Sequence, residues 1–149
     1  MQRAIALIIF VVLVVASIFY FNSEKNSNYV FNQKIIVKNV PIKVAIVDTE
    51  DERASGLSNR RPLKRDEALF FVFESPGLYG IWMKEMNFSI DVIWFDENLK
   101  VVFVKENFSP ESYPEVAYPS VKALYVLETQ AGLAEEHAIS IGDELKISK

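Results

Sequence analysis

The chain has 149 residues, enough for one domain, and half of them are hydrophobic. The apolar residues are concentrated near the amino terminus, and the remainder has the size and charge of an ordinary acidic domain, which excludes a multidomain enzyme, a disordered protein and a polytopic transporter. With no cysteine and a single histidine, the chain excludes a disulfide framework, a thiol nucleophile and a Cys-based zinc site; we expect no metal site and no cofactor.

An unbroken apolar run, Ala4–Phe21, follows the basic start of the chain. As a helix it spans about 27 Å, close to the roughly 30 Å hydrocarbon core of a bilayer. It is longer than a signal-peptide core, and the bulky residues Ile18–Phe21 directly follow the small residues Ala16 and Ser17, which makes a poor cleavage site. We therefore predict that residues 1–21 are a single transmembrane anchor. A cleaved signal peptide, which would release a secreted domain, is the alternative.

The charges beside this run predict its orientation. Arg3 and the amino terminus precede it, whereas Glu24 and Lys25 cancel after it, so the amino terminus is expected in the cytoplasm and the domain outside it. Beyond the anchor the chain keeps all 20 acidic residues and stays acidic, which argues against nucleic acid as a partner. The predicted partners are the lipid bilayer, through residues 4–21, and a small polar ligand; a protein partner is left open.

A polar segment rich in Asn and Ser, residues 22–28, predicts a short tether, and the domain is expected over residues 29–149. Short β-type runs separated by turn residues follow. The first two flank Asn39-Val40-Pro41 and predict a hairpin, and Asp96-Glu97-Asn98 predicts a hairpin turn between two later strands. The predicted strands are Lys34–Val37, Ile42–Val47, Ala68–Phe73, Gly80–Glu85, Ser89–Phe95, Lys100–Lys105, Lys122–Thr129 and Glu144–Ile147.

Helix is scarce in this domain. Thr49 and Glu52 have the spacing of a capping box, which predicts a short helix that ends at Gly56. Residues 131–137 predict one or two further turns, and Phe108–Pro119, with three prolines, predicts a long ordered loop. We therefore expect a β-rich α+β domain of about seven or eight short strands and one or two short helices. Its sheet is expected to be a strongly bent antiparallel or mixed sheet, or a partly open barrel.

Strand alternation singles out three candidate site residues. In Gly80–Glu85, Trp82 and Lys84 share one face, and in Ser89–Phe95 the carboxylate of Asp91 stands among apolar residues and needs a partner if it is buried. Lys84 is the nearest cation in the sequence. The Lys84–Asp91 pair is either a salt bridge that holds two strands in register or a pair that faces a ligand, and the sequence leaves both open.

Arginines near the predicted helix are the next candidates. Arg53 lies one turn from Leu57, so its guanidinium either binds a carboxylate, phosphate or sugar acid at the edge of a pocket or is solvated. Arg60 begins the only concentrated basic run, Arg60–Arg65, which is either a contact for anionic lipid or polymer or simply an exposed turn.

From about Lys43 to the carboxyl terminus, an ordered set of short motifs resembles the domain-of-unknown-function family 192 (DUF192). The resemblance implies a compact β-rich fold and an uncharacterised role. The matching motifs are Val47-Asp48-Thr49, Glu52-Arg53, Gly56-Leu57 with Arg60, Leu69–Phe73, Trp82-Met83-Lys84, Ile90-Asp91, Phe95-Asp96, Tyr118-Pro119-Ser120, Val126-Leu127-Glu128, Ala131-Gly132 and Ile141-Gly142-Asp143.

The chain departs from the family pattern at two places. Glu85-Met86 stands where the family commonly has Asn-Thr, and Ser58 stands where it has Met, so a ligand that contacts these positions would differ here. The resemblance implies six residues as lining a pocket: Arg53, Arg60, Trp82, Lys84, Asp91 and Glu128.

Three functions remain open. The first is a membrane-tethered binding module for a small polar ligand, a saccharide or a carboxylated metabolite, with Trp82 as the stacking surface. The second is an envelope interaction protein that uses a sheet edge or the Phe108–Pro119 loop. The third is a hydrolase with Asp91 and Glu128 as a carboxylate pair. No nucleophile motif is present and His137 follows two glutamates in a polar run, so no catalytic residue is assigned.

Overall fold

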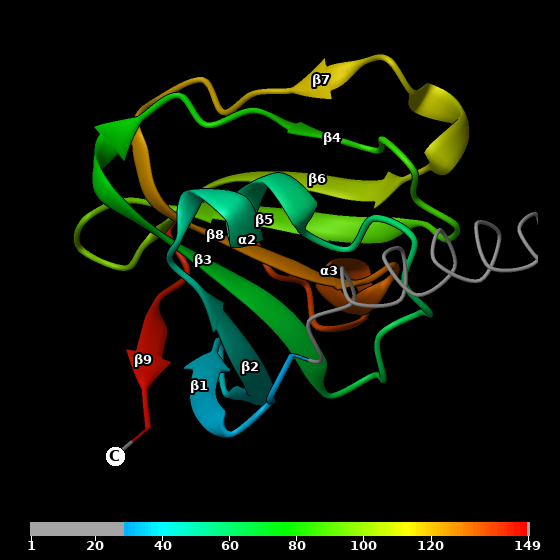
Figure 1. The fold of residues 1–149 in the computed structure, drawn as a ribbon. Helices are drawn as coiled ribbons and strands as arrows, with labels where there is room; N and C mark the ends of the chain where they lie inside the picture. The colour runs from blue at the N-terminus through cyan, green and yellow to red at the C-terminus, as the bar shows by residue number, and fades with distance from the viewer. Residues whose placement is uncertain (1–28, 149) are drawn as a thin grey trace, which may run out of the picture.

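The computed structural model describes residues 29–148, and the predicted anchor and tether lie outside the described residues. Between residues 29 and 148, no helix is both long enough and apolar enough to cross a bilayer. The domain is β-rich α+β: a seven-stranded sheet curls into a half-barrel, with two short α-helices and a small two-stranded ribbon (Figure 1). The expectation of a strongly bent mixed sheet is confirmed.

The strands of the large sheet are ordered β6-β5-β8-β3-β2-β1-β9. All neighbours are antiparallel except β2 and β3, which are joined by a crossover that contains α2 and are parallel. A separate ribbon pairs β4 with β7. The elements are β1 (Gln33–Val37), β2 (Val40–Val47), α2 (Glu50–Ser55), β3 (Glu67–Gly77), β4 (Ile81–Trp82), β5 (Ile90–Phe95), β6 (Val101–Phe108), η1 (Pro110–Ser112), β7 (Val116–Ala117), β8 (Ala123–Gln130), α3 (Leu133–Glu136) and β9 (Leu145–Ile147).

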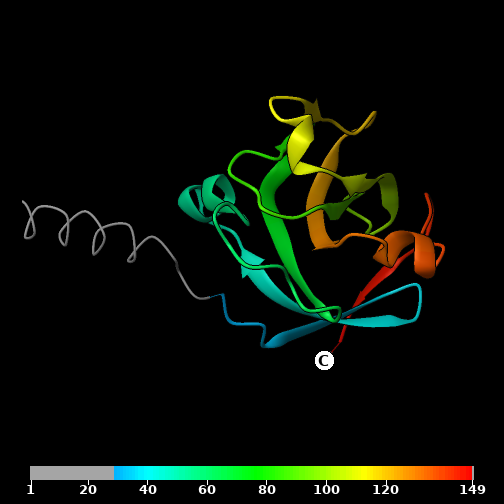
Figure 2. The ribbon, with the colours of Figure 1, turned by 90° about the vertical axis from the view of Figure 1, so that its right-hand side faces the viewer.

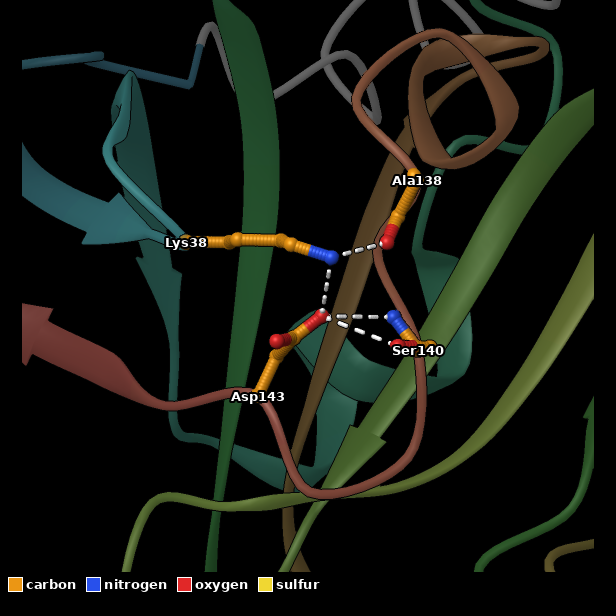
Figure 3. A network of polar contacts seen from close by, with 4 residues as sticks. All are labelled: Lys38, Ala138, Ser140 and Asp143. Atoms are coloured by element: carbon orange, nitrogen blue, oxygen red, sulfur yellow. Dashed lines mark hydrogen bonds and ion pairs between the residues drawn. The ribbon is translucent and has the colours of Figure 1, made fainter.

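The curl brings the two ends of the sheet together (Figure 2). The segment before β9 bonds to the start of β6: Val101 N donates to Asp143 O at 2.8 Å, and Leu145 N donates to Leu99 O at 2.8 Å. Lys38, in the β1–β2 turn, binds the same segment, with its Nζ 3.2 Å from Asp143 Oδ2 and a hydrogen bond to Ala138 O (Figure 3). These contacts fix the carboxyl-terminal segment against both the start of β6 and the first hairpin.

Both faces of the sheet are buried, so the domain has two hydrophobic clusters. One, the α2-side core, contains Leu57 from the turn after α2 together with Val92 and Trp94 of β5. The other, the α3-side core, contains Leu133 of α3 with Ile93 of β5. All six residues of β5 are buried because alternate side chains enter the two cores.

The predicted strand Gly80–Glu85 is the clearest difference from expectation. Only Ile81–Trp82 is strand, and Glu85 has a φ of +56°, which turns the chain before β5. The predicted alternation nevertheless holds from Ile81 to Lys84, since Trp82 and Lys84 are exposed while Ile81 and Met83 are buried, and it ends at Glu85, which is exposed. The proline-rich loop also contains the short elements η1 and β7, and β7 is the partner of β4.

Candidate functional site

The carboxyl group of Glu128 is the chemical centre of the candidate site. Glu128 lies on β8 opposite Val92 of β5, so its side chain enters the α2-side core, where it is 5 % exposed. Its Oε2 atom has no hydrogen-bond partner within the described part of the chain. Burial raises the pKa of this carboxyl to about 8. At neutral pH the group is therefore mostly protonated, and it can donate a hydrogen bond as well as accept one.

A cavity of about 60 Å³ adjoins this carboxyl. One wall is formed by α2 and the turn that follows it, and another by β4. The lining residues are Arg53, Ala54, Ser55, Gly56, Leu57, Ser58, Gly80, Ile81, Trp82, Met86, Ile90 and Glu128. The volume accommodates a hydroxyl or hydroxymethyl group of a ligand rather than a whole ring.

The end of α2 is shaped to approach Glu128. Gly56 stops the helix with a φ of +44°, a conformation that favours glycine. A Cβ atom at this position would lie 3.9 Å from Glu128 Oε2 and 3.7 Å from the ring of Phe71. Glycine thus both permits the turn and leaves open the space beside the carboxyl.

Trp82 provides an accessible aromatic surface at this cavity. Its side chain lines the cavity and remains 49 % exposed. Lys84 Nζ lies 5.5 Å from the indole centroid, and the ring of Tyr113 meets the indole edge-on with 6.2 Å between centroids. These neighbours orient the indole while leaving about half of it open to solvent.

The two predicted arginines bind backbone carbonyl groups. Arg53 lines the cavity, but its Nη1 donates to Val72 O at 3.0 Å and also to Asp48 O, and its guanidinium stacks on Phe73. Arg60 Nε donates to Gly56 O at 3.1 Å, with the guanidinium 4.1 Å from the Tyr29 ring centroid. Arg53 therefore holds α2 against β3, and Arg60 joins the turn after α2 to Tyr29.

The predicted Lys84–Asp91 pair is not formed. Asp91 is fully buried, with Oδ1 accepting from Asn107 N and Oδ2 accepting from Ala134 N, each at 2.8 Å. No ion pair between Lys84 and Asp91 occurs in the described part of the chain, because β4 pairs with β7 rather than with β5. Asp91 joins β6 and α3 to the sheet, and its partners are backbone amides.

Asp91 and Glu128 also do not form a carboxylate pair. In the β5–β8 register Asp91 lies opposite Thr129, whereas Glu128 lies opposite Val92. Neighbouring positions on a strand point to opposite faces, so the two carboxyl groups enter different cores. The geometry required by the predicted hydrolase is absent at these residues. Nor do any three acidic or imidazole side chains in residues 29–148 cluster closely enough to hold a metal ion.

Sequence reasoning found part of this site and missed part. Arg53, Trp82 and Glu128 do line one cavity, and Lys84 contacts Trp82. The sequence predicts Gly56 as a helix end and as part of a family motif, but not as a residue that lines the cavity. Ser58 and Met86, two positions that depart from the family pattern, also line the cavity, and Ser58 Oγ donates to Lys84 O at 2.8 Å. Those departures were the one available signal for these residues.

Comparison with known proteins identifies a family and a fold. The DUF192 family, described as Uncharacterized ACR, matches residues 33–147. No curated protein matches the chain. A solved structure of a "putative transcription regulator" from Sinorhizobium meliloti 1021 superposes with a TM-score of 0.72 at 22% identity, over 77% of this chain and 92% of that one. A protein of unknown function from Novosphingobium aromaticivorans DSM 12444 gives 0.71 at 24% identity, over 76% and 83%. At these identities the two structures share the fold alone.

Proposed function

The chain belongs to the DUF192 family, whose function is uncharacterised, and from that premise we propose that it binds a neutral saccharide at the Glu128 cavity. We further propose that residues 1–21 anchor it in the cell membrane with the domain outside the cytoplasm. The observation that carries the binding proposal is the unpartnered, buried Oε2 of Glu128 beside the exposed ring of Trp82.

A buried polar atom without a partner destabilises a fold and calls for an explanation. At Glu128 the unpartnered atom belongs to a carboxyl group that lines a cavity. Carboxyl groups with a strongly shifted pKa cluster at functional sites, so this cavity is a candidate binding site. A hydroxyl group of a ligand would supply the missing partner, because it can both accept from a protonated carboxyl and donate to it. A sugar presents several such hydroxyl groups.

Trp82 supports a ring-shaped ligand. The C–H face of a pyranose is apolar and packs on aromatic rings, and Trp82 both lines the Glu128 cavity and is about half exposed. A sugar stacked there would place one hydroxyl or hydroxymethyl group in the cavity and keep its ring outside, which matches a volume of about 60 Å³.

The contacts of the arginines favour a neutral sugar over a carboxylated metabolite. A carboxylate ligand is bound most strongly by a cation that points at it. Arg53 lines the cavity but donates to the carbonyls of Asp48 and Val72. The carboxyl of Glu128, once ionised, would repel a second carboxylate in the same cavity. A neutral ligand needs no cation in the cavity and is not repelled by ionised Glu128.

A thermal-shift panel on the full-length chain in detergent tests this proposal. Glucose, galactose and N-acetylglucosamine form the neutral set, and glucuronate and glutamate form the acidic set. At a concentration of 100 times Kd, one or more neutral sugars should stabilise the protein by about 2.7 kcal/mol. Trp82→Ala should abolish the shift, while Ile141→Ala, at a 70 % exposed position, should keep it. A panel without any shift, or a shift that survives Trp82→Ala, contradicts the proposal.

A protein partner in the envelope is the second candidate function. Exposed apolar side chains gather on and beside the β4–β7 ribbon, as expected of an interaction surface. They are Leu78, Trp82, Tyr113, Tyr118 and Val121. In that case Tyr118→Ala, which lies outside the cavity lining, would weaken in-cell crosslinking to the partner as much as Trp82→Ala does, and no sugar would stabilise the protein.

A further inference from the structure

A second and larger cavity lies beside the predicted basic run. It has a volume of about 330 Å³ and shares only Leu57 with the Glu128 cavity. It is lined by Tyr29, Phe31, Leu57, Arg60, Arg61, Pro62, Leu63, Lys64 and Glu67. We propose that this basic cavity binds the phosphate group of an anionic phospholipid, so that the domain docks on the membrane beside its own anchor. The inference rests on the proposed anchor and is independent of the saccharide site.

The charges of the lining favour an anion. The lining contains three cationic side chains, those of Arg60, Arg61 and Lys64, and one carboxylate, that of Glu67. Glu67 Oε1 is 2.9 Å from Lys64 Nζ. Arg61 is exposed, and no carboxylate in residues 29–148 forms an ion pair with it. A guanidinium group fits two phosphate oxygens at once, and a neighbouring ammonium adds a second positive charge. The lining therefore has an excess of positive charge and includes a guanidinium group of the kind that binds phosphate oxygens.

The first described residue is fixed at this cavity. Tyr29 lines it, and the Tyr29 hydroxyl donates to Gly56 O at 3.3 Å and lies 3.4 Å from Glu52 O. Residues 22–28 connect Tyr29 to the predicted anchor, and seven residues span at most about 25 Å. The cavity therefore lies where the tether joins the domain, and Tyr29 is within about 25 Å of the end of the predicted anchor.

The short tether to the predicted anchor also favours a lipid as the ligand of this cavity. The rest of the domain is acidic, so an anionic surface repels it in most orientations and attracts it through the basic cavity. A short tether also gives a lipid of the same membrane a much higher effective concentration at the cavity than a soluble phosphate compound has. Charge and tether length therefore both point to the phospholipid headgroup.

Hydrogen exchange of the full-length chain in nanodiscs tests this inference. The discs contain phosphatidylcholine alone or with phosphatidylglycerol, and the readout is the exchange rate of backbone amides in residues 57–67. Phosphatidylglycerol should slow exchange in this segment at least threefold, and 0.5 M salt should reverse the effect because exposed charges are then screened. The double variant Arg61→Ala/Lys64→Ala should lose the protection. The matched control Lys100→Ala/Lys122→Ala, which removes two exposed lysines elsewhere, should keep it.

The remaining outcomes separate the two proposals. If the chain does not insert into either type of disc, the proposed anchor is wrong and the docking inference is wrong with it. If the chain inserts in both types and exchange is the same, the anchor stands and the docking inference is overturned. If inorganic phosphate protects the segment equally in discs of phosphatidylcholine alone, the cavity binds soluble phosphate and lipid docking is also overturned.

Discussion

Glu128 makes the stability of the domain depend on pH. Its pKa is about 8 in the folded state because it is buried, and it returns to its ordinary value near 4.5 on unfolding. Between those two values the unfolded chain releases the proton while the folded chain retains it, so this group lowers the free energy of unfolding as pH rises from about 4.5 to 8. Below pH 4.5 its stabilising contribution is fully present.

Glu128→Gln should remove this dependence. An amide has nearly the same shape and no charge, so the variant and the natural protein should have similar free energies of unfolding at pH 5. At pH 8.5 the variant should be the more stable, because it avoids burying a carboxylate. Urea titrations at the two pH values measure the difference. A difference that stays constant with pH would show that Glu128 is ionised throughout, contrary to this account.

Asp91 is expected to matter for stability through the backbone, independently of Lys84. Asp91→Ala leaves the amides of Asn107 and Ala134 buried without acceptors, at about 1–3 kcal/mol each. Lys84→Ala removes an exposed side chain and should change stability by less than about 0.5 kcal/mol. The double variant should equal the sum of the single ones. Partial recovery in the double variant would instead reveal the ion pair that the structure lacks.

Among the elements, α2 was fully predictable because its signals are local. Thr49 Oγ1 accepts from Glu52 N at 3.3 Å, and Glu52 Oε2 accepts from Thr49 N at 3.3 Å, which completes the predicted capping box. The helix ends at Gly56 as its sequence predicts. Each of these contacts joins residues within one turn, so no knowledge of the tertiary fold was needed.

Replacing the cap tests how much it stabilises the domain. Thr49→Ala should cost about 1 kcal/mol of unfolding free energy, because the amide of Glu52 loses its acceptor. Thr49→Ser keeps the hydroxyl and serves as the control, with little loss. Equal stability of the alanine and serine variants in urea titration would mean that the cap contributes nothing.

The partner of strand β4 could not be predicted from the local sequence. The alternation of this segment correctly predicts that Trp82 and Lys84 share one face, but the pairing of β4 with β7 depends on a segment more than thirty residues later in the chain. Sequence proximity suggested β5 as the neighbour, which led to the wrong partner for Asp91. Strand pairing is decided by tertiary packing, and alternation within one strand contains no information about it.

At the scale of the whole molecule, the fold class and most strand positions follow from the sequence, whereas the orientation of the site does not. Asp91 is a candidate because it stands in an apolar strand, whereas Glu128 is implied as a pocket residue by the family resemblance. Because both faces of the sheet are buried, only the β5–β8 register shows that Glu128 enters the α2-side core and Asp91 the other. The sequence therefore predicts both residues as candidates. The strand register shows that Glu128 lies at the cavity and that Asp91 has a structural role.

The central claim is that the protonated carboxyl of Glu128 binds a neutral sugar stacked on Trp82. Calorimetric titration at pH 6 and pH 9, with the sugar that gives the largest shift in the panel, tests it most directly. In this account the carboxyl donates its proton to a sugar oxygen, and an ionised carboxylate has no proton to donate. With a pKa of about 8, roughly one tenth of the carboxyl groups stay protonated at pH 9, so the apparent Kd should rise about tenfold. Glu128→Gln, whose amide still donates, should bind with the same Kd at both values. Equal affinity of the natural protein at pH 6 and pH 9 would contradict the account.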